Sequence, residues 1–227
     1  MCIINNSKKF IFIHIPKTAG TSVALFFSRY SRYCDLEIGA TQLGEAIQPE
    51  FLKRFKIWKH STAQEIKSVV GDAIFEEYKT FTFVRNPYDR LFSTYKFLKT
   101  WPHWPGHEKF VQFQTYQQFI ESGWWTGKVK PDRMFRRQIS WIRESSRGPL
   151  LKIDFICKLE NIKNDIDRLC EGIGLDRERG GRIQRINKAE LQERNVLPEN
   201  LLKKLMLFYA IDFDYFGYST DYGKYAL

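Results

Sequence analysis

The sequence is poor in residues that crosslink a chain or bind a metal ion, which excludes several kinds of site. Its 227 residues include four cysteines and four histidines, with no C-x-x-C pair and no ligand-like histidine spacing. A zinc site and a disulfide framework are therefore not expected in a chain of this length. We expect reduced thiols, a cytoplasmic location and no metal.

Long apolar runs and long basic runs are also missing. No stretch of about eighteen apolar residues occurs, and the opening MCIINNSKK lacks the apolar segment of a signal peptide, so we expect neither a transmembrane segment nor secretion. The net charge is +10, yet no basic block interrupts the sequence, which places the charge on a folded surface. Such a surface suits an anionic partner. On charge alone, nucleic acid, a nucleotide, an acidic glycan and an anionic membrane all stay open.

The apolar residues that are present suffice for a core and alternate between strand-like and helix-like patterns. Hydrophobic residues make up 43% of the chain and aromatic residues 16%, which excludes a disordered protein. Strands are predicted at 10–15, 81–84 and 150–160, and helices at 21–33, 42–58, 72–79, 87–99, 109–121, 132–146, 161–174 and 197–216. Ser61 and Gln64 stand in capping-box spacing and predict another helix just after His60.

This alternation predicts an α/β fold with a central, mainly parallel sheet flanked by helices, a P-loop-like arrangement in three layers. With no internal repeat and no low-complexity linker, residues 1–227 are expected to form a single domain.

The segment FIFIHIPKTAGTSVALFF, at 10–27, predicts a site for an anion. Gly20 should let the backbone turn tightly, so that amides face outward at the positive end of the next helix. A lysine and three hydroxyl residues add donors: Lys17, Thr18, Thr21 and Ser22. The lysine precedes the glycine and no Mg²⁺ carboxylate stands nearby, so this is not a Walker A loop and should hold phosphate without a metal. The alternative is an ordinary turn with a solvated Lys17.

A second strand–turn–helix unit follows in KTFTFVRNPYDRLFSTYKFLK, at 79–99. Asn86 is expected to cap the helix and Pro87 to occupy its first position. Arg85 ends the strand at the carboxyl edge of the sheet, and Ser93 lies about two helical turns further on, on a stripe that also includes Arg90. Arg85 and Ser93 could therefore hold one phosphate between them. Alternatively, Arg85 pairs with an acid and Ser93 is a surface residue.

Together, HIPKTAGTS and FTFVRNPYDRLFSTY resemble the two nucleotide-binding signatures of carbohydrate-type sulfotransferases. The likeness is strongest to the group with the heparan and chondroitin/dermatan O-sulfotransferases and their bacterial relatives. It continues through WKHSTAQEI, KIDFICKLENIKNDI and FYAIDFDYFGYS, from about residue 10 to 218. The resemblance implies 3′-phosphoadenosine 5′-phosphosulfate (PAPS) as donor, with its 5′-phosphosulfate in the Lys17–Ser22 loop and its 3′-phosphate on Arg85 and Ser93. Ala19 replaces a glycine often seen there and should still permit the turn.

The resemblance also implies a catalytic chemistry. Sulfuryl transfer needs a base for the acceptor hydroxyl and stabilisation of the departing phosphate oxygen, and Lys17 suits the second role. His60 matches the position at which the resembling enzymes carry their base. The dipole of the helix that follows should keep its imidazole neutral. Alternatively, His60 only caps that helix or packs against Trp58. His14, inside a strand, is expected to be structural.

The sequence gives fewer indications of the acceptor site than of the donor site. Basic residues crowd the segment 128–152, and four polar residues fall on one face of its predicted helix: Arg136, Ser140, Arg143 and Arg147. Aromatic rings stack on sugars and arginines pair with acids, so candidate acceptor-binding residues are Arg136, Arg143, Trp104 and His107. The alternative is a solvated basic face beside core tryptophans. In RERGGRIQRINK (177–188), Arg182 or Lys188 could reach the 3′-phosphate.

Departures from the family leave rival functions open. Membrane-bound members carry a transmembrane anchor and a lumenal stem; we expect neither in this chain, which argues against a lumenal glycosaminoglycan role and favours a soluble, bacterial enzyme. The leading hypothesis is a sulfotransferase that acts on a saccharide hydroxyl. A second hypothesis keeps PAPS and makes the acceptor a small alcohol, a phenol or a lipid. A third is a non-catalytic binding module for nucleic acid or acidic polysaccharide. Its anion residues, however, cluster at two strand ends, and no RNA-binding or helix-turn-helix signature appears, so no nucleic-acid partner is expected. The oligomeric state stays open.

Overall fold

The structure is a computed structural model that describes residues 2–127, 132–183 and 195–227. Its contacts divide the chain into two compact units. Unit 1 comprises Met1–Val84 and Ser140–Ile186, and unit 2 comprises Arg85–Ile139 and Asn187–Leu227. Each unit is therefore assembled from two separate stretches of sequence.

Unit 1 contains a five-stranded sheet in the order β3-β1-β2-β4-β5. The strands are β1 (Cys2–Asn5), β2 (Phe10–Ile13), β3 (Leu36–Ile38), β4 (Lys79–Val84) and β5 (Phe155–Lys158). β2, β4 and β5 run parallel, whereas β1 is antiparallel to both of its neighbours. The predicted α/β fold with a mainly parallel centre is confirmed. The strands expected at 10–15, 81–84 and 150–160 are present with adjusted ends, and β1 and β3 were not predicted.

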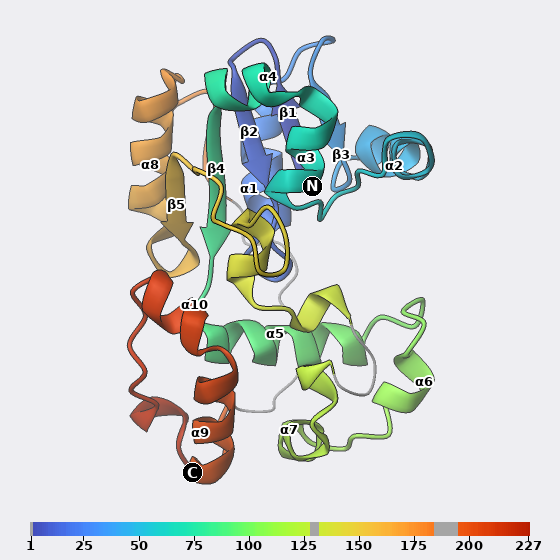
Figure 1. The fold of residues 1–227 in the computed structure, drawn as a ribbon, viewed down its shortest axis with the longest axis vertical. Helices are drawn as coiled ribbons and strands as arrows, with labels where there is room; N and C mark the ends of the chain where they lie inside the picture. Colours follow the sequence, from blue (N-terminus) through green and yellow to red (C-terminus); the bar gives the residue numbers. More distant parts are fainter. Residues whose placement is uncertain (1, 128–131, 184–194) are drawn as a thin grey trace. The chain divides into compact units, whose positions relative to one another are not determined.

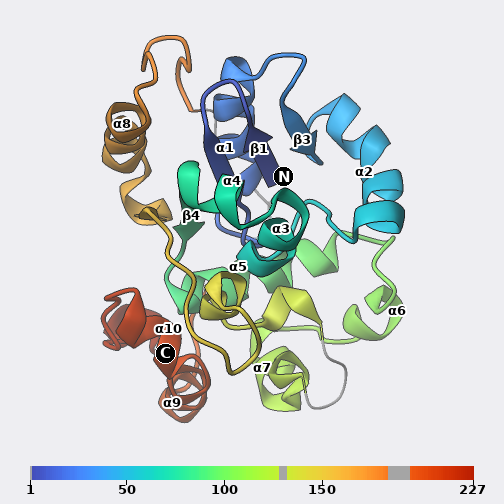
Figure 2. The same ribbon diagram turned by 45° about the horizontal axis from the view of Figure 1, so that its top comes forward.

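Helices lie on both faces of this sheet (Figure 1). Behind the strands, α1 (Gly20–Phe27) shares one buried apolar cluster with α8 (Ile162–Ile173), built on Phe12 of β2 and Phe81 of β4. In front lie α3 (Ala63–Val70) and α4 (Asp72–Glu77), while α2 (Gln42–Phe55) follows β3 (Figure 2). Because strand side chains alternate between faces, the buried Ile11 and Ile13 face the layer opposite Phe12.

Local capping chemistry explains where these helices begin and end. α3 starts one residue later than expected, because its capping box pairs Thr62 with Glu65 rather than Ser61 with Gln64. The Ser61 hydroxyl instead accepts the backbone N–H of Trp58 at 2.9 Å. α8 ends, as predicted, on a glycine: Gly174 has φ 72°, a left-handed conformation that glycine adopts without strain.

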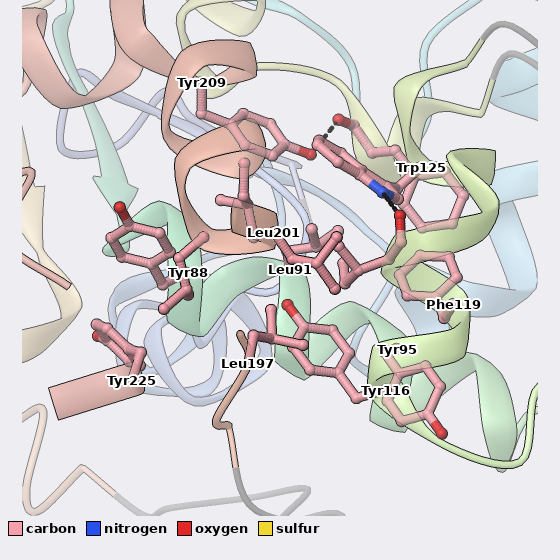
Figure 3. Packing of buried hydrophobic residues seen from close by; sticks show 14 of the residues in the cluster. Tyr88, Leu91, Tyr95, Tyr116, Phe119, Trp125, Leu197, Leu201, Tyr209 and Tyr225 are labelled. Carbon is pink, nitrogen blue, oxygen red and sulfur yellow. Dashed lines mark hydrogen bonds between the residues drawn. The ribbon is translucent and has the colours of Figure 1, made fainter. Parts of the chain in front are cut away.

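In unit 2, α5 (Pro87–Lys99) is surrounded by α6 (His107–Phe110), α7 (Tyr116–Ser122), α9 (Glu199–Phe208) and α10 (Ala210–Tyr215) (Figure 1). As predicted, the Asn86 side chain caps α5 by accepting the N–H of Tyr88 at 3.0 Å, and Pro87 is its first residue. The core is mostly aromatic, with Tyr95, Trp125 and Tyr209 fully buried (Figure 3). Short 3₁₀ helices across both units are Ser28–Tyr30, Trp124–Thr126, Arg133–Phe135, Gln138–Ile142, Leu159–Asn161 and Gly223–Tyr225.

The helix predicted over 132–146 does not form, and two short 3₁₀ helices stand in its place. Beside the short-range bonds of these 3₁₀ turns, several of its backbone polar groups are bound by side chains from distant elements. The carbonyls at 134–136 accept hydrogen bonds from Arg90 and Tyr209, and the amides of 138 and 139 donate to Asp212. The basic face predicted there, with Arg136, Ser140, Arg143 and Arg147 aligned, is therefore wrong.

None of the helices in the described ranges combines the length and the apolarity needed to cross a membrane.

Candidate active site

The loop between β2 and α1 turns by an unusual backbone route. Lys17 has φ 69° and Ala19 has φ 63°, both in the left-handed region that costs a non-glycine residue about 1–2 kcal/mol. Gly20, which was expected to provide the turn, is instead the first residue of α1 and is not among the residues with positive φ. The strained conformation therefore falls on the predicted anion-binding Lys17 and on Ala19 rather than on Gly20.

Gly20 is required for a different reason, namely close packing. A Cβ atom on Gly20 would stand 1.6 Å from Nε2 of His14. The His14 imidazole is buried, with 6% of its surface exposed, and its ring stacks on Phe12 with centroids 5.7 Å apart. A side chain at position 20 would thus displace a ring that the core holds in place.

Paired substitutions should separate these two effects. We expect Gly20→Ala to lower the free energy of unfolding by about 1–3 kcal/mol, because it overpacks the site against His14. Ala19→Gly should raise it by up to about 1 kcal/mol, since glycine removes the left-handed strain but adds entropy to the unfolded chain. Urea titrations of both variants measure the two changes. Wild-type stability in Gly20→Ala would contradict the packing seen around His14.

The first turn of α1 has neither a side-chain cap nor an acidic residue. Its N-cap residue, Ala19, has no side-chain acceptor. Amides of this turn therefore present the positive end of the helix dipole beside Lys17. The Thr18 hydroxyl was expected to donate to the anion. It donates instead to the Ile15 carbonyl at 2.9 Å, a hydrogen bond within the loop. The chemistry of the loop fits a phosphate or phosphosulfate group.

The imidazole ring of His60 is hydrogen-bonded to the residue that follows β2. Nδ1 of His60 lies 3.2 Å from the backbone carbonyl of His14. A carbonyl oxygen can only accept, so Nδ1 carries the proton and Nε2 keeps a lone pair. Trp141 holds the same residue from another side, since its Nε1–H donates to the His60 carbonyl at 3.2 Å. The edge of Trp58 also contacts the imidazole, with centroids 5.2 Å apart.

The surroundings keep the His60 ring neutral. Burial lowers the pKa of His60 well below its ordinary value of 6.5, and the positive charges of Lys59 and Lys17 lower it further. The cause differs from the expected one. The helix dipole was expected to do this, yet His60 stands two residues before Thr62, the N-cap of α3. Burial also lowers the pKa of the neighbouring His14, so both imidazoles are neutral at pH 7.

Arg85 follows the last residue of β4 and has its backbone held by one side chain. The Arg85 N–H donates to Oε1 of Gln138 at 2.9 Å, and Nε2 of Gln138 donates to the Arg85 carbonyl at 2.9 Å. Ser93 lies on α5 and is half-buried. Arg90, on the same predicted stripe, is buried and donates to backbone carbonyls, so it is a structural residue. That Arg85 and Ser93 together bind one phosphate stays a prediction.

Two of the predicted acceptor-binding residues take part in the packing of unit 2. Trp104 is only 6% exposed, and its Nε1–H donates to Asp132 at 2.9 Å. His107 is the first residue of α6, and its Nδ1 lies 2.9 Å from the Leu98 carbonyl. These contacts account for both side chains without an acceptor.

The other two lie outside that packing. Arg136 is exposed. Arg143, in unit 1, donates to the Gly148 carbonyl at 2.8 Å across a turn. Roles in acceptor binding stay predictions for all four residues.

The start of the basic loop 176–188 is attached to the 3₁₀ helix Ser28–Tyr30, which follows α1. Arg29 donates to the Gly180 carbonyl, and Arg179 donates to the Arg29 carbonyl at 2.9 Å. Arg182 is exposed. Lys188 lies outside the described residues, so a contact of either residue with a 3′-phosphate stays a prediction. Within the ranges that the structure describes, no three His, Cys, Asp or Glu residues gather as a metal site.

Sequence reasoning missed the residues that position this site. The His14 carbonyl, the Trp141 indole and the Gln138 amide hold His60 or Arg85 through backbone contacts. A backbone carbonyl has no sequence signature, and Trp141 and Gln138 fell in a segment assigned to a helix.

Comparison with known proteins gives one match. No curated protein and no solved structure matches this chain. The profile of the Sulfotransferase family, in contrast, matches residues 1–219 and so runs through both units. The matched range includes the Lys17–Ser22 loop, His60, Arg85 and Ser93. With almost the whole length matched, this chain is a member of the sulfotransferase family.

Proposed function

We propose that this protein is a PAPS-dependent O-sulfotransferase that sulfates a carbohydrate hydroxyl without a metal ion, in one catalytic domain formed by the whole chain. The observation that carries the proposal is the hydrogen bond between Nδ1 of His60 and the His14 carbonyl. This bond supports the proposal because it holds the imidazole of His60 against His14, which follows β2 and stands three residues before Lys17, with the proton on Nδ1. The proposed base and the proposed anion loop would then lie at the same end of one strand.

The Lys17–Ser22 loop would hold the 5′-phosphosulfate. Amides at the start of α1 donate to its oxygens, and the Lys17 ammonium stabilises the negative charge that develops on the departing phosphate. Thr21 and Ser22 supply further donors, while Thr18 and Ala19 shape the loop and offer their backbone amides. The donor supplies the sulfuryl group and departs as adenosine 3′,5′-bisphosphate.

The other residues take the acceptor and the far end of the nucleotide. Nε2 of His60 accepts the proton of the acceptor hydroxyl as its oxygen forms the new bond to sulfur. Arg85 and Ser93 would bind the 3′-phosphate, with Arg182 or Lys188 as additional contacts. A net charge of +10 favours an acidic glycan as acceptor. Arg136, Arg143, Trp104 and His107 are the candidates to bind it.

Calorimetry tests the donor assignment. We expect adenosine 3′,5′-bisphosphate to bind without a metal ion, and ATP with Mg²⁺ to bind more weakly. The loop carries a lysine and helix amides but lacks the acidic residue that a Mg²⁺–ATP site needs. A clear preference for ATP with Mg²⁺ would instead indicate a kinase.

The pH dependence of kcat/KM should report the partly buried imidazole of His60. A base must be unprotonated, and burial lowers the pKa of His60. The acid limb of the profile, where activity is lost as the pH falls, should therefore lie below the ordinary histidine value of 6.5. Activity should stay level from there up to neutral pH. A limb centred at or above 6.5 would show that another group, or an exposed His60, acts as the base.

A further inference from the structure

The side chain of Gln138 binds the backbone of Arg85, although no sequence motif includes Gln138. Gln138 is fully buried, and its side-chain amide makes both hydrogen bonds that the Arg85 backbone can offer, each 2.9 Å long. This is the pattern that a neighbouring strand would supply, here provided by one side chain. The peptide from which the arginine side chain departs is thereby fixed on both sides.

The backbone of Gln138 is in turn bound by a carboxylate. Its backbone N–H donates to Oδ2 of Asp212 at 2.7 Å, and the N–H of Ile139 donates to Oδ1 at 3.0 Å. Asp212 has no exposed surface and lies on α10. Burial raises the pKa of its carboxyl, and the nearby positive charge of Arg90 opposes that rise.

Arg90 completes the support. Its guanidinium is 1% exposed and donates to the carbonyls of Met134 and Arg136, just ahead of Gln138. Two buried charged side chains thus fix a segment that forms no regular helix. Burying charged groups is costly unless they are paired and hydrogen-bonded. A connecting loop does not need two buried charged side chains to hold it. Here they fix the position of the Gln138 amide.

We propose that Gln138 is a positioning residue for recognition of the 3′-phosphate: it orients the Arg85 backbone so that the guanidinium meets the phosphate without first being ordered. This inference rests on the proposed function, because it takes Arg85 as the 3′-phosphate ligand. A ligand whose conformation is fixed beforehand binds more tightly, since less entropy is lost on binding. Gln138 therefore contributes to affinity for the donor without touching it.

The test compares two nucleotides that differ only in the 3′-phosphate. The ratio of Kd for AMP to Kd for adenosine 3′,5′-bisphosphate, measured by calorimetry, isolates that group. For the wild type a charge-assisted contact should give a ratio of at least about 10. Gln138→Met keeps the side-chain volume and removes both hydrogen bonds. We expect it to lower the ratio about fivefold to tenfold, while the Kd for AMP stays within about twofold.

Three further variants make the result specific to Arg85. In an Arg85→Ala background, Gln138→Met should have no added effect on the ratio. Tyr225→Phe is the matched control: it removes one hydrogen bond to Asp89, in the first turn of α5, without a charge change, and should leave the ratio unaltered. Should Gln138→Met fail to fold, Gln138→Asn retains the amide but is too short to make both bonds, and it should lower the ratio in the same direction.

The outcomes separate the two proposals. A wild-type ratio near 1 would refute the 3′-phosphate site and with it the proposed donor. A high wild-type ratio that Gln138→Met or Gln138→Asn leaves unchanged would refute the positioning role alone. Equal weakening of both nucleotides would also refute it, because the effect would then be one of general stability.

Discussion

Replacing His60 by alanine should abolish turnover and leave donor binding nearly unchanged. The imidazole is the base in our proposal, and its Nδ1–H bond to the His14 carbonyl leaves Nε2 available to accept a proton. General bases typically contribute about 10²–10⁴-fold to a rate. We therefore expect kcat for sulfuryl transfer to a panel of acidic polysaccharides to fall by at least about a hundredfold. The Kd for adenosine 3′,5′-bisphosphate should change by less than about threefold, since a neutral ring contributes no ionic contact to the phosphates.

Two companion variants make this prediction specific. His60→Gln preserves polarity and most of the volume but cannot act as a base, so it should be as inactive as His60→Ala. His103→Ala removes an exposed histidine and should retain wild-type turnover. Circular dichroism must show that both His60 variants are folded, because this ring also contacts His14 and Trp58. Wild-type activity in folded His60→Ala would eliminate His60 as the base.

Replacing Lys17 by alanine should produce the second large effect. Lys17 belongs to the loop that leads into α1, and in our proposal its ammonium neutralises the phosphosulfate in the ground state and the phosphate charge in the transition state. Loss of one charge-assisted contact should weaken binding of adenosine 3′,5′-bisphosphate by about 1.5–3 kcal/mol. The loss in kcat/KM should be larger still, because the charge on the departing oxygen grows during transfer.

The matched control for this variant is Lys9→Ala. Lys9 precedes β2 at the opposite end of the strand from the loop and pairs with Glu77 at 2.5 Å. Like Lys17→Ala, the Lys9→Ala variant removes one positive charge from unit 1. We expect its nucleotide affinity to stay within about twofold of wild type at physiological ionic strength, because exposed charges are screened beyond about 8 Å. Equal effects of the two lysines would show that overall charge, and not the loop, governs binding.

Local chemistry accounts for the parts of the fold that the sequence predicted well. Asn86 and Pro87 begin α5 because an asparagine cap and a proline in the first position need no tertiary partner. Gly174 ends α8 for the same kind of reason. The continuous apolar run of β2 indicated a strand buried on both faces, and β2 is buried along its whole length.

Tertiary contacts decided the parts that it missed. Segment 132–146 has helical residues but lost the helix to hydrogen bonds with side chains from elements far along the chain: Arg90 and Tyr209 donate to its carbonyls, and Asp212 accepts from its amides. β1 and β3 are short, and each acquires strand geometry only by pairing with its neighbours. No local pattern reports such partners.

The candidate site divides in the same way. Lys17 and the start of α1 could be located from residue types and spacing, and His60 from the resemblance to a family. The left-handed conformations at Lys17 and Ala19 could not, because neither residue favours them. Nor could the contact of His14 with Gly20, which depends on how one strand and one helix pack.

The division of each unit into two sequence stretches has a consequence for biosynthesis. The aromatic core of unit 2 joins Tyr88 near the middle of the chain to Phe213 and Tyr225 near its end, with ring centroids 5.0 Å and 4.8 Å from Tyr88. A ribosome synthesises the intervening polypeptide before Phe213 and Tyr225, so the α5 surface stays uncovered while that segment emerges. Contacts of such long range form slowly, and a nascent chain in that condition is a natural client for chaperones.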